Sequence, residues 1–143
     1  MNRRTAAAVL LLASFAAVPA FSADSSLEVV PAGYRGMAVP ISGEQTAFVK
    51  KGDRIDVMVT FDAKMKDGKE KVTATILQNV LVLEVIRPGK IDDKGVVEMI
   101  LNPNEAQYLA LSLQQGELRV SVRAPGDKEM HPMEMASFRK LFQ

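Results

Sequence analysis

Two long runs of strand-forming residues dominate the middle of the chain. In residues 54–61 every second side chain is a large apolar one, and residues 72–86 are almost all β-branched or aliphatic. An Asp-Gly pair at 67–68 lies between the runs, and such a pair accepts the positive backbone angles of a tight primed turn. A Gln-Asn pair at 78–79 interrupts the second run and indicates a bend or bulge. The chain is therefore expected to fold around a sheet that contains a long hairpin.

A helix is expected over residues 103–115. Asn102 can cap its first turn, Pro103 loses no hydrogen bond at the first helical position, and Glu105 can complete a capping box. Gly116 is expected to end the helix in left-handed geometry. Helical spacing brings four apolar residues onto the face that would pack on the sheet: Ala106, Leu109, Ala110 and Leu113.

Three further strands are expected, at residues 36–41, 96–101 and 117–123. The segment 132–143 is expected to form a short helix. The predicted fold class is accordingly mainly β, of the α+β type. It consists of hairpins, one helix packed on the sheet and a short C-terminal helix.

The first 23 residues have the three parts of a cleavable secretion signal. Arg3 and Arg4 supply the basic start, residues 6–18 form an apolar stretch, and small residues follow. Cleavage after Ala20 and cleavage after Ser22 both fit, and a polar, flexible lead at 24–28 then precedes the domain. The chain is therefore expected to be exported, with no membrane span left after cleavage.

The composition of the exported chain excludes several classes of protein. Loss of Arg3 and Arg4 from the 18 basic residues leaves 16 against 17 acidic ones, a net charge of −1. The densest basic run, 64–71, is interrupted by acids, so nucleic acid is not an expected partner. Without cysteine the chain cannot be a disulfide-stapled mini-protein or use thiol chemistry. About 120 residues suit a single domain stabilised by its core alone.

No group of residues has the spacing of a catalytic or metal site. His131 is the only histidine, and the sequence fixes no nucleophile or carboxylate beside it. A metal site would be left with oxygen ligands alone, and the acidic pair Asp92-Asp93 is better explained as part of a turn than as a calcium site. We therefore expect no enzymatic activity, no cofactor and no metal.

Apolar residues gather in the C-terminal tail, residues 128–143. Three methionines lie close together there, and flexible thioethers suit adaptable protein-binding surfaces. One interpretation is an exposed patch that docks on a partner, and the other is a tail that packs onto the domain as part of its core. The candidate docking residues are Met130, Met133, Met135, Phe138, Leu141 and Phe142.

Three segments carry extended motifs. Residues 30–41 read VPAGYRGMAVPI and are followed by VKKGDRIDVMVT at 49–60. Residues 75–83 read TILQNVLVL, and the third segment extends from LNPNEAQ at 101–107 to VRAPGD at 122–127. In this order the segments resemble the periplasmic part of the Flp (Tad) pilus assembly proteins of the CpaB (RcpC) family.

The resemblance implies a β-clip-like domain, related to the SAF module, in the periplasm of a Gram-negative envelope. It implies work through protein contacts near the secretin of a pilus machine, with no reaction and no cofactor. Members of the family usually carry a transmembrane anchor and a complete SAF module ahead of the first motif, whereas here the expected signal leads almost at once into it. The fold-defining motif residues are Pro31, Gly33, Arg35, Gly52, Asp53, Arg54, Gln78, Asn79, Pro125, Gly126 and Asp127.

Two functions from different classes follow. The first is a non-catalytic periplasmic scaffold or assembly factor for a Flp/Tad-type pilus or secretin machine, whose sheet edges and tail bind proteins by strand addition and apolar docking. The second is a carbohydrate or small-ligand binding module of SAF type, although only Tyr34 and Tyr108, and no tryptophan, are present to stack on sugars. The expected division is a domain at 29–127 and a tail at 128–143, with self-association left open.

Overall fold

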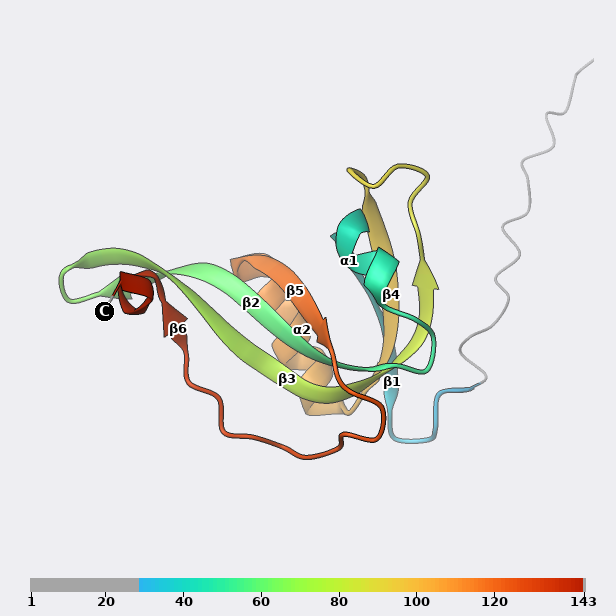
Figure 1. The fold of residues 1–143 in the computed structure, drawn as a ribbon. Helices are drawn as coiled ribbons and strands as arrows, with labels where there is room; N and C mark the ends of the chain where they lie inside the picture. The colour runs from blue at the N-terminus through green and yellow to red at the C-terminus, as the bar shows by residue number, and fades with distance from the viewer. Residues whose placement is uncertain (1–28, 143) are drawn as a thin grey trace, which may run out of the picture.

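The structure, a computed structural model, describes residues 29–142, so the expected signal and the lead at 24–28 lie outside the described residues. The elements in chain order are β1 (Arg35–Ser42), α1 (Gly43–Phe48), β2 (Arg54–Met65), β3 (Gly68–Ile86), β4 (Lys94–Leu101), α2 (Pro103–Gln115), β5 (Glu117–Val122), β6 (Ala136–Ser137) and a 3₁₀ helix (Phe138–Phe142). They form one antiparallel sheet in the order β1-β4-β3-β2-β5, with β6 paired to β3 (Figure 1). The mainly β, α+β fold class is confirmed.

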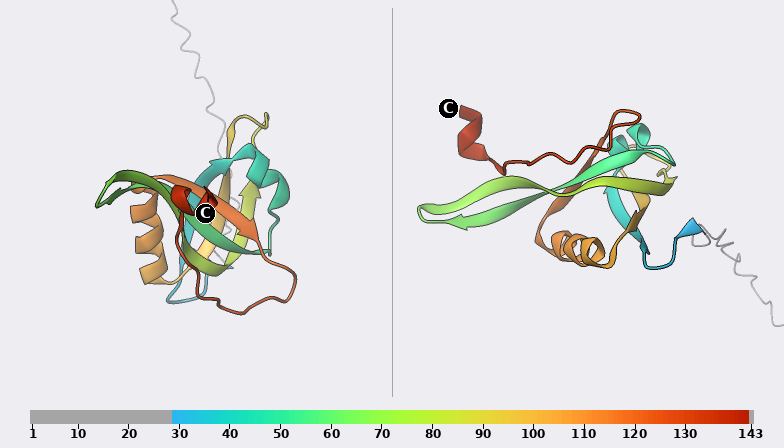
Figure 2. Two further views of the ribbon diagram at one scale, coloured as in Figure 1. Left: turned by 60° about the vertical axis from the view of Figure 1, so that its left-hand side comes forward. Right: turned by 90° about the horizontal axis from the view of Figure 1, so that it is seen from below.

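One hairpin projects well beyond the rest of the sheet. β4 pairs with β1 along its whole length and with the last residues of β3, while β5 pairs with the first half of β2. The remaining halves of β2 and β3 continue as a twisted two-stranded ribbon that stands clear of the body of the fold (Figure 2). We call residues 61–72 of this ribbon the arm.

An aliphatic core lies between the curved body of the sheet and α2. The helix contacts all five main strands, since the sheet curves around it. Ile55, Val57 and Val59 of β2 are buried, as their alternation predicted. Fully buried residues of the other elements complete the core: Val39, Val97, Met99, Leu101 and Leu109. Apolar burial is thus the main source of stability in a domain that has no disulfide.

β3 is bent where the sequence predicts a bend. Ile55 and Val57 of β2 have one residue between them, but their partners on β3 have two, Gln78 and Asn79. Asn79 accommodates the extra length with a φ of 59°, a left-handed conformation that asparagine tolerates better than most residues. This bulge bends the strand between the body and the arm.

The turn of the long hairpin differs from the predicted type. Met65 pairs with Gly68, so the two turn residues are Lys66 and Asp67. Of these four described residues only Gly68 has a positive φ, 127°, whereas a primed turn needs positive φ inside the turn itself. The hairpin is confirmed. The primed turn expected on Asp67 and Gly68 is wrong, because Gly68 is the first residue of β3 and does not occupy a central turn position.

The N-terminus of α2 is built as predicted. The Asn102 side chain accepts hydrogen bonds from the backbone N–H groups of Asn104 and Glu105, each at 2.9 Å. The Glu105 carboxylate accepts the Asn102 N–H at 2.7 Å, and Pro103 follows at the first helical position. This capping box satisfies N–H groups that have no partner within the helix.

The other end of α2 and its packed face differ from the prediction. Gly116 ends the helix, but its φ of −171° and ψ of −166° are extended and not left-handed. A Cβ on Gly116 would lie 2.0 Å from the Thr60 carbonyl oxygen, so a close approach to β2 requires the glycine. Ala110 of the expected apolar stripe is exposed, and Ser112 is buried instead. A helix enclosed by a curved sheet packs a broader face against it, and this face includes the small side chain of Ser112.

The tail contains the expected short helix, confined to the 3₁₀ helix at its end. Before it, Pro125 and Gly126 form a turn, and residues 127–135 then run without helix or strand alongside β3 toward the end of the arm (Figure 2). β6 pairs with β3 through Ala136 with Thr73 and Ser137 with Val72. Because the backbone of this segment is used in strand pairing, a helix cannot begin as early as residue 132.

Candidate functional site

Residues from all three motif segments meet beside the bend of β3. Asp56 of β2 is buried, and its Oδ1 accepts hydrogen bonds from Arg123 Nη1 and from the Asn79 backbone N–H, both at 2.9 Å. Arg54 Nη1 donates to the Asn79 carbonyl oxygen, also at 2.9 Å. These contacts hold the left-handed Asn79 at both its N–H and its carbonyl. We call Arg54, Asp56, Asn79 and Arg123 the buried network.

Arg123 extends the buried network to the start of the tail. Its Nη2 donates to Asp127 Oδ1 at 2.9 Å and to the Glu129 carbonyl oxygen. Pro125 and Gly126, the latter with a φ of 82°, form the turn that brings Asp127 back to Arg123. This hydrogen bond holds the pKa of Asp127 below its usual range and raises the pKa of Arg123. Both groups are therefore ionised at neutral pH, which favours a charge-assisted contact.

Gln78 holds the tail at a second point. Its Nε2 donates to the His131 carbonyl oxygen at 2.8 Å, and its Oε1 accepts the His131 N–H at 3.1 Å. The side-chain amide therefore pairs with this backbone segment much as a neighbouring strand would. The bulge residue Gln78 thus has a defined task, which is to attach the tail to β3.

The end of the tail is fixed to the arm at a third place. Beyond the β6 pairing, the Arg139 backbone N–H donates to Glu70 Oε1 at 3.0 Å, and Arg139 Nη1 lies 3.5 Å from Asp67 Oδ2. Glu70 is buried, and the hydrogen bond from the Arg139 N–H is the main cause of its lowered pKa. The tail is therefore attached by polar contacts along its length.

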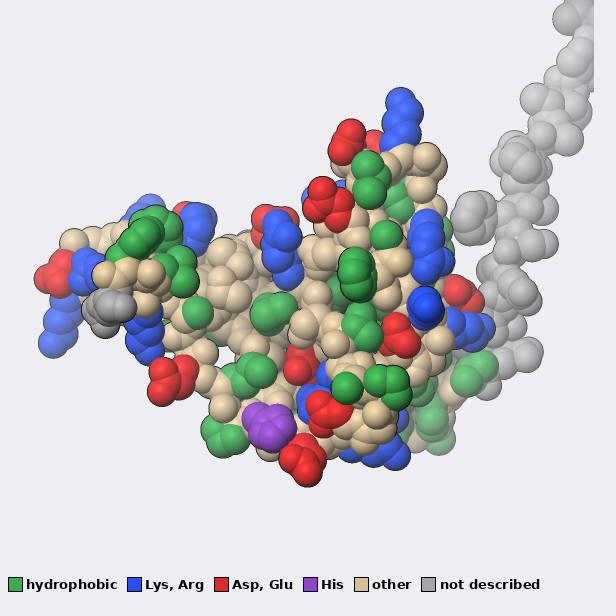
Figure 3. Space-filling view, in the orientation of Figure 1, with side chains coloured by type: hydrophobic (Ala, Val, Ile, Leu, Met, Phe, Trp, Pro, Cys, Tyr) green, Lys and Arg blue, Asp and Glu red, His purple; other side chains and the backbone are tan. Residues whose placement is uncertain are grey.

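The apolar side chains of the tail lie outside the core cluster of the domain. All six predicted docking residues are between 48% and 76% exposed. Phe138 and Phe142 contact each other edge to face, with ring centroids 5.1 Å apart. Apolar side chains gather at the end of the arm, on the left of Figure 3. The exposed set consists of Met130, Met133, Met135, Phe138, Leu141 and Phe142.

Gly52 and Asp53 lie in the turn before β2. The Gly52 N–H donates to the Val82 carbonyl oxygen at 2.9 Å, and the Val82 N–H donates to the Asp53 carbonyl oxygen at 3.0 Å. The Asp53 carboxylate accepts the Lys50 N–H at 2.8 Å. Gly52 has a φ of 86°, which explains a glycine here. These hydrogen bonds fix the turn to β3 and involve no residue of the buried network.

Pro31, Gly33 and Arg35 lie in and after the turn that precedes β1. The Tyr34 N–H donates to the Pro31 carbonyl oxygen at 3.0 Å, and Gly33 has a φ of 88°. Arg35 Nη1 donates to the Tyr34 carbonyl oxygen at 2.9 Å. Within residues 29–142 these three motif residues make no hydrogen bond to the buried network.

A shallow groove lies between β5 and α1, a helix that the sequence did not predict. The groove has a volume of about 430 Å³, and its lining includes Phe48, Val49 and Val122. Gln45 Oε1 accepts the Val120 N–H at 2.7 Å, and therefore occupies a hydrogen-bonding position on the free edge of β5. Strand addition at this position would have to displace Gln45.

The acidic and histidine side chains of the described segment are dispersed. No group of three or more Asp, Glu, His or Cys residues within 29–142 comes close enough to hold a metal ion. His131 is exposed, with Glu129 at 3.8 Å, and Asp92 and Asp93 lie in the turn before β4. Over the same range, no helix has the length and apolar character needed to cross a membrane.

The roles of Asp56 and Arg123 were not predicted from the sequence. The sequence does contain a signal that Asp56 has a charged partner. Asp56 lies between the core residues Ile55 and Val57, and a buried charge in such a strand needs a partner. The pattern could not identify the partner, since Arg123 is 67 positions further along the chain.

These observations define a class of protein: a small antiparallel β domain that holds an apolar tail on its surface by polar contacts. Residues 26–123 match the family model of the Flp pilus assembly protein RcpC/CpaB. The match covers well over half of the chain, so the chain belongs to the RcpC/CpaB family, as its motifs indicated. No curated protein and no solved structure matches it.

Proposed function

We propose that the chain is a non-catalytic assembly factor of a Flp pilus machine that works in the periplasm through contacts with other proteins. Its family assigns it to Flp pilus assembly. The observation that carries the contact role is the tail, whose apolar side chains are exposed although its backbone is attached to the domain. An exposed apolar patch on an ordered segment is typical of an interaction site. The secretion signal expected at residues 1–23 supports a periplasmic location.

The proposal divides the chain by task. The domain at 29–127 supplies a rigid support, and the tail at 128–143 supplies the contact surface. The motif residues have structural roles in this scheme, since Arg54, Asn79 and Asp127 belong to or adjoin the buried network and Gln78 holds the tail directly. The capped edge of β5 favours the tail over strand addition as the means of contact.

Affinity isolation from envelope extract tests the proposal. The tagged chain is expected to recover Flp pilus components, the secretin among them, identified by mass spectrometry. The variant Met130→Ser/Met133→Ser/Met135→Ser is expected to reduce this recovery roughly tenfold, because exposed anchor residues contribute most of the binding free energy. Its melting temperature is expected to remain within about 3 °C of the wild type, since the three side chains lie outside the core.

A matched control removes three exposed apolar side chains elsewhere. Val29→Ser/Ile86→Ser/Ile91→Ser lies outside the tail and is expected to keep full recovery of pilus components. A wild-type chain that recovers no Flp component would contradict the proposed function. Equal losses in the two triple variants would show that the tail has no special part in the contact.

A further inference from the structure

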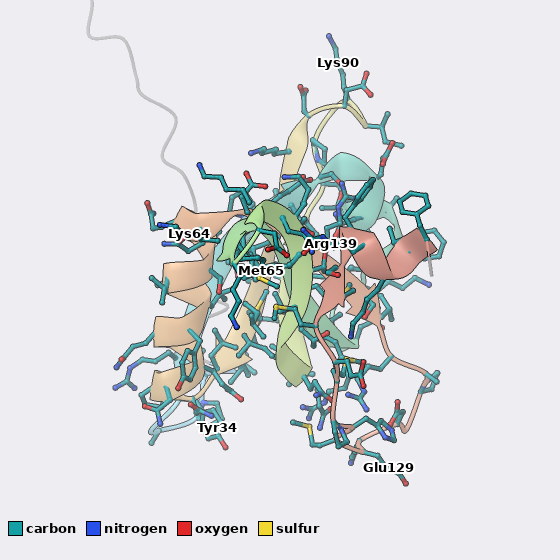
Figure 4. All side chains as sticks on the ribbon, turned by 90° about the vertical axis from the view of Figure 1, so that its left-hand side faces the viewer. Tyr34, Lys64, Met65, Lys90, Glu129 and Arg139 are labelled. Carbon is teal, nitrogen blue, oxygen red and sulfur yellow. The ribbon has the colours of Figure 1, made fainter. Side chains whose placement is uncertain are left out.

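The end of the arm gathers apolar side chains from two distant parts of the sequence. Arg139 in the 3₁₀ helix contacts both Glu70 and Asp67, which places this helix beside the turn between β2 and β3 (Figure 4). Cross-strand alternation puts Met65 on the same face of the arm as Glu70. We call four exposed apolar residues the tip patch: Met65, Phe138, Leu141 and Phe142.

Three lysines at the same end have no ionic partner within the described residues. Lys64, Lys66 and Lys69 are exposed, and no carboxylate of residues 29–142 lies at ion-pair distance from them. The nearby acids are engaged by other cations: Asp62 by Lys71, Asp67 and Glu70 by Arg139, and Glu134 by Lys140. The uncompensated charge at the end of the arm is therefore positive.

Two of these lysines are placed at a cost to the hairpin. Lys64 and Lys69 are directly opposed cross-strand partners. Like charges directly opposite each other destabilise a strand pair, and an opposite charge at either position would stabilise it. An anionic surface that approaches the end of the arm relieves this repulsion.

The shape of the arm distinguishes between anionic partners. A narrow two-stranded ribbon projects from the body (Figure 2), and Met65 and the three lysines belong to its last residues, in and on either side of the turn. Apolar and basic side chains gather at this end of the molecule, on the left of Figure 3. A stable protein interface usually needs about 800 Å² of contact on each partner, which the narrow end of a two-stranded ribbon offers only to a partner that encloses it. A lipid surface accepts inserted apolar side chains and presents phosphates to basic residues without a fitted hollow.

We propose that the end of the arm docks on an anionic phospholipid surface. The tip patch inserts at the boundary between head groups and acyl chains when the arm docks end-on. Lys64 and Lys69, which alternation places on the opposite face of the arm from Met65, then reach lipid phosphates together with Lys66. Lipid docking goes beyond the proposed function, because it gives the end of the arm a lipid partner and leaves protein contact to the three methionines of the tail.

Sedimentation of the purified chain with vesicles tests this inference. Vesicles of phosphatidylglycerol and phosphatidylethanolamine are expected to bind it at least about tenfold more strongly than vesicles of phosphatidylcholine, with weaker binding at high salt. The variant Lys64→Glu/Lys66→Glu/Lys69→Glu is expected to bind roughly a hundredfold more weakly, since each basic residue near an anionic surface contributes about fivefold. Phe138→Ser/Leu141→Ser/Phe142→Ser is expected to lose binding as well.

A charge-matched control separates the arm from the net charge of the chain. Lys90→Glu/Lys94→Glu/Lys128→Glu makes the same change in net charge at exposed positions outside the arm, and it is expected to retain vesicle binding. Lys90 lies well away from Lys64 and Met65 in Figure 4. Equal binding to neutral vesicles, or equal losses in both lysine variants, would overturn the inference. A chain that recovers pilus proteins but binds no anionic vesicle would also overturn it, while leaving the proposed function intact.

Discussion

Replacing Arg123 with methionine is expected to lower the melting temperature by about 10 °C or more. The change removes one of the two hydrogen bonds to Asp56 Oδ1 and leaves this carboxylate buried without an ionic partner. It also removes the contacts to Asp127 and to the Glu129 carbonyl, so the start of the tail is released. An uncompensated buried charge is among the most destabilising changes that a fold can suffer.

Thermal unfolding measured by circular dichroism checks this expectation. Lys51→Met is the control, because it breaks the exposed ion pair with Glu84, and such pairs contribute little to stability. The double variant Asp56→Ala/Arg123→Met is expected to lose less than the sum of the two single variants, since the residues share one interaction. If Arg123→Met melted like Lys51→Met, the buried network would have no part in stability.

Replacing Gly116 with alanine is expected to lower the free energy of unfolding by about 3 kcal/mol or more. The new Cβ would lie 2.0 Å from the Thr60 carbonyl oxygen and 2.8 Å from the Thr60 carbonyl carbon. These are backbone atoms of β2, which cannot move aside as a flexible side chain would. α2 would have to shift away from the strand and so loosen its packing in the core.

Urea denaturation measures this loss against a matched glycine. At Gly89 an added Cβ would have no heavy-atom neighbour within 4 Å, so Gly89→Ala is expected to change stability by less than about 1 kcal/mol. Similar denaturation midpoints for the two variants would show that α2 does not approach β2 as closely as the structure indicates.

The sequence predicted the elements that local patterns determine. Alternation in β2, the aliphatic run of β3 and the capping residues Asn102 and Glu105 each act within a few positions, and all were confirmed. The bend at Gln78 and Asn79 was predictable for the same reason, because two polar residues interrupt an otherwise aliphatic strand.

Features that depend on distant residues could not be predicted in the same way. The left-handed end expected at Gly116 was wrong because Thr60, on another element, determines the need for glycine there. The attachment of the tail depends on Gln78 and His131, which are 53 positions apart, and neither residue indicates the other. Exposure of Ala110 likewise follows from how the sheet curves around α2 and not from helical spacing.

The tail and the family motifs are linked by structure. The family match ends at Arg123, and the tail that follows is held by residues inside the matched region, Gln78 and Arg123 among them. The motif residues therefore support a surface that lies beyond the matched segment. This arrangement explains why polar side chains lie at the bend of β3, where packing of the core alone would not require them.

The proposed function requires that the apolar side chains of the tail form a contact surface and are not part of the core. The melting temperature of Phe138→Asp decides this point, because Phe138 is 58% exposed and contacts Phe142 in the same short helix. We expect a melting temperature within about 3 °C of the wild type, as for other surface substitutions. A fall of more than about 10 °C, as expected for the loss of a buried phenylalanine, would contradict it.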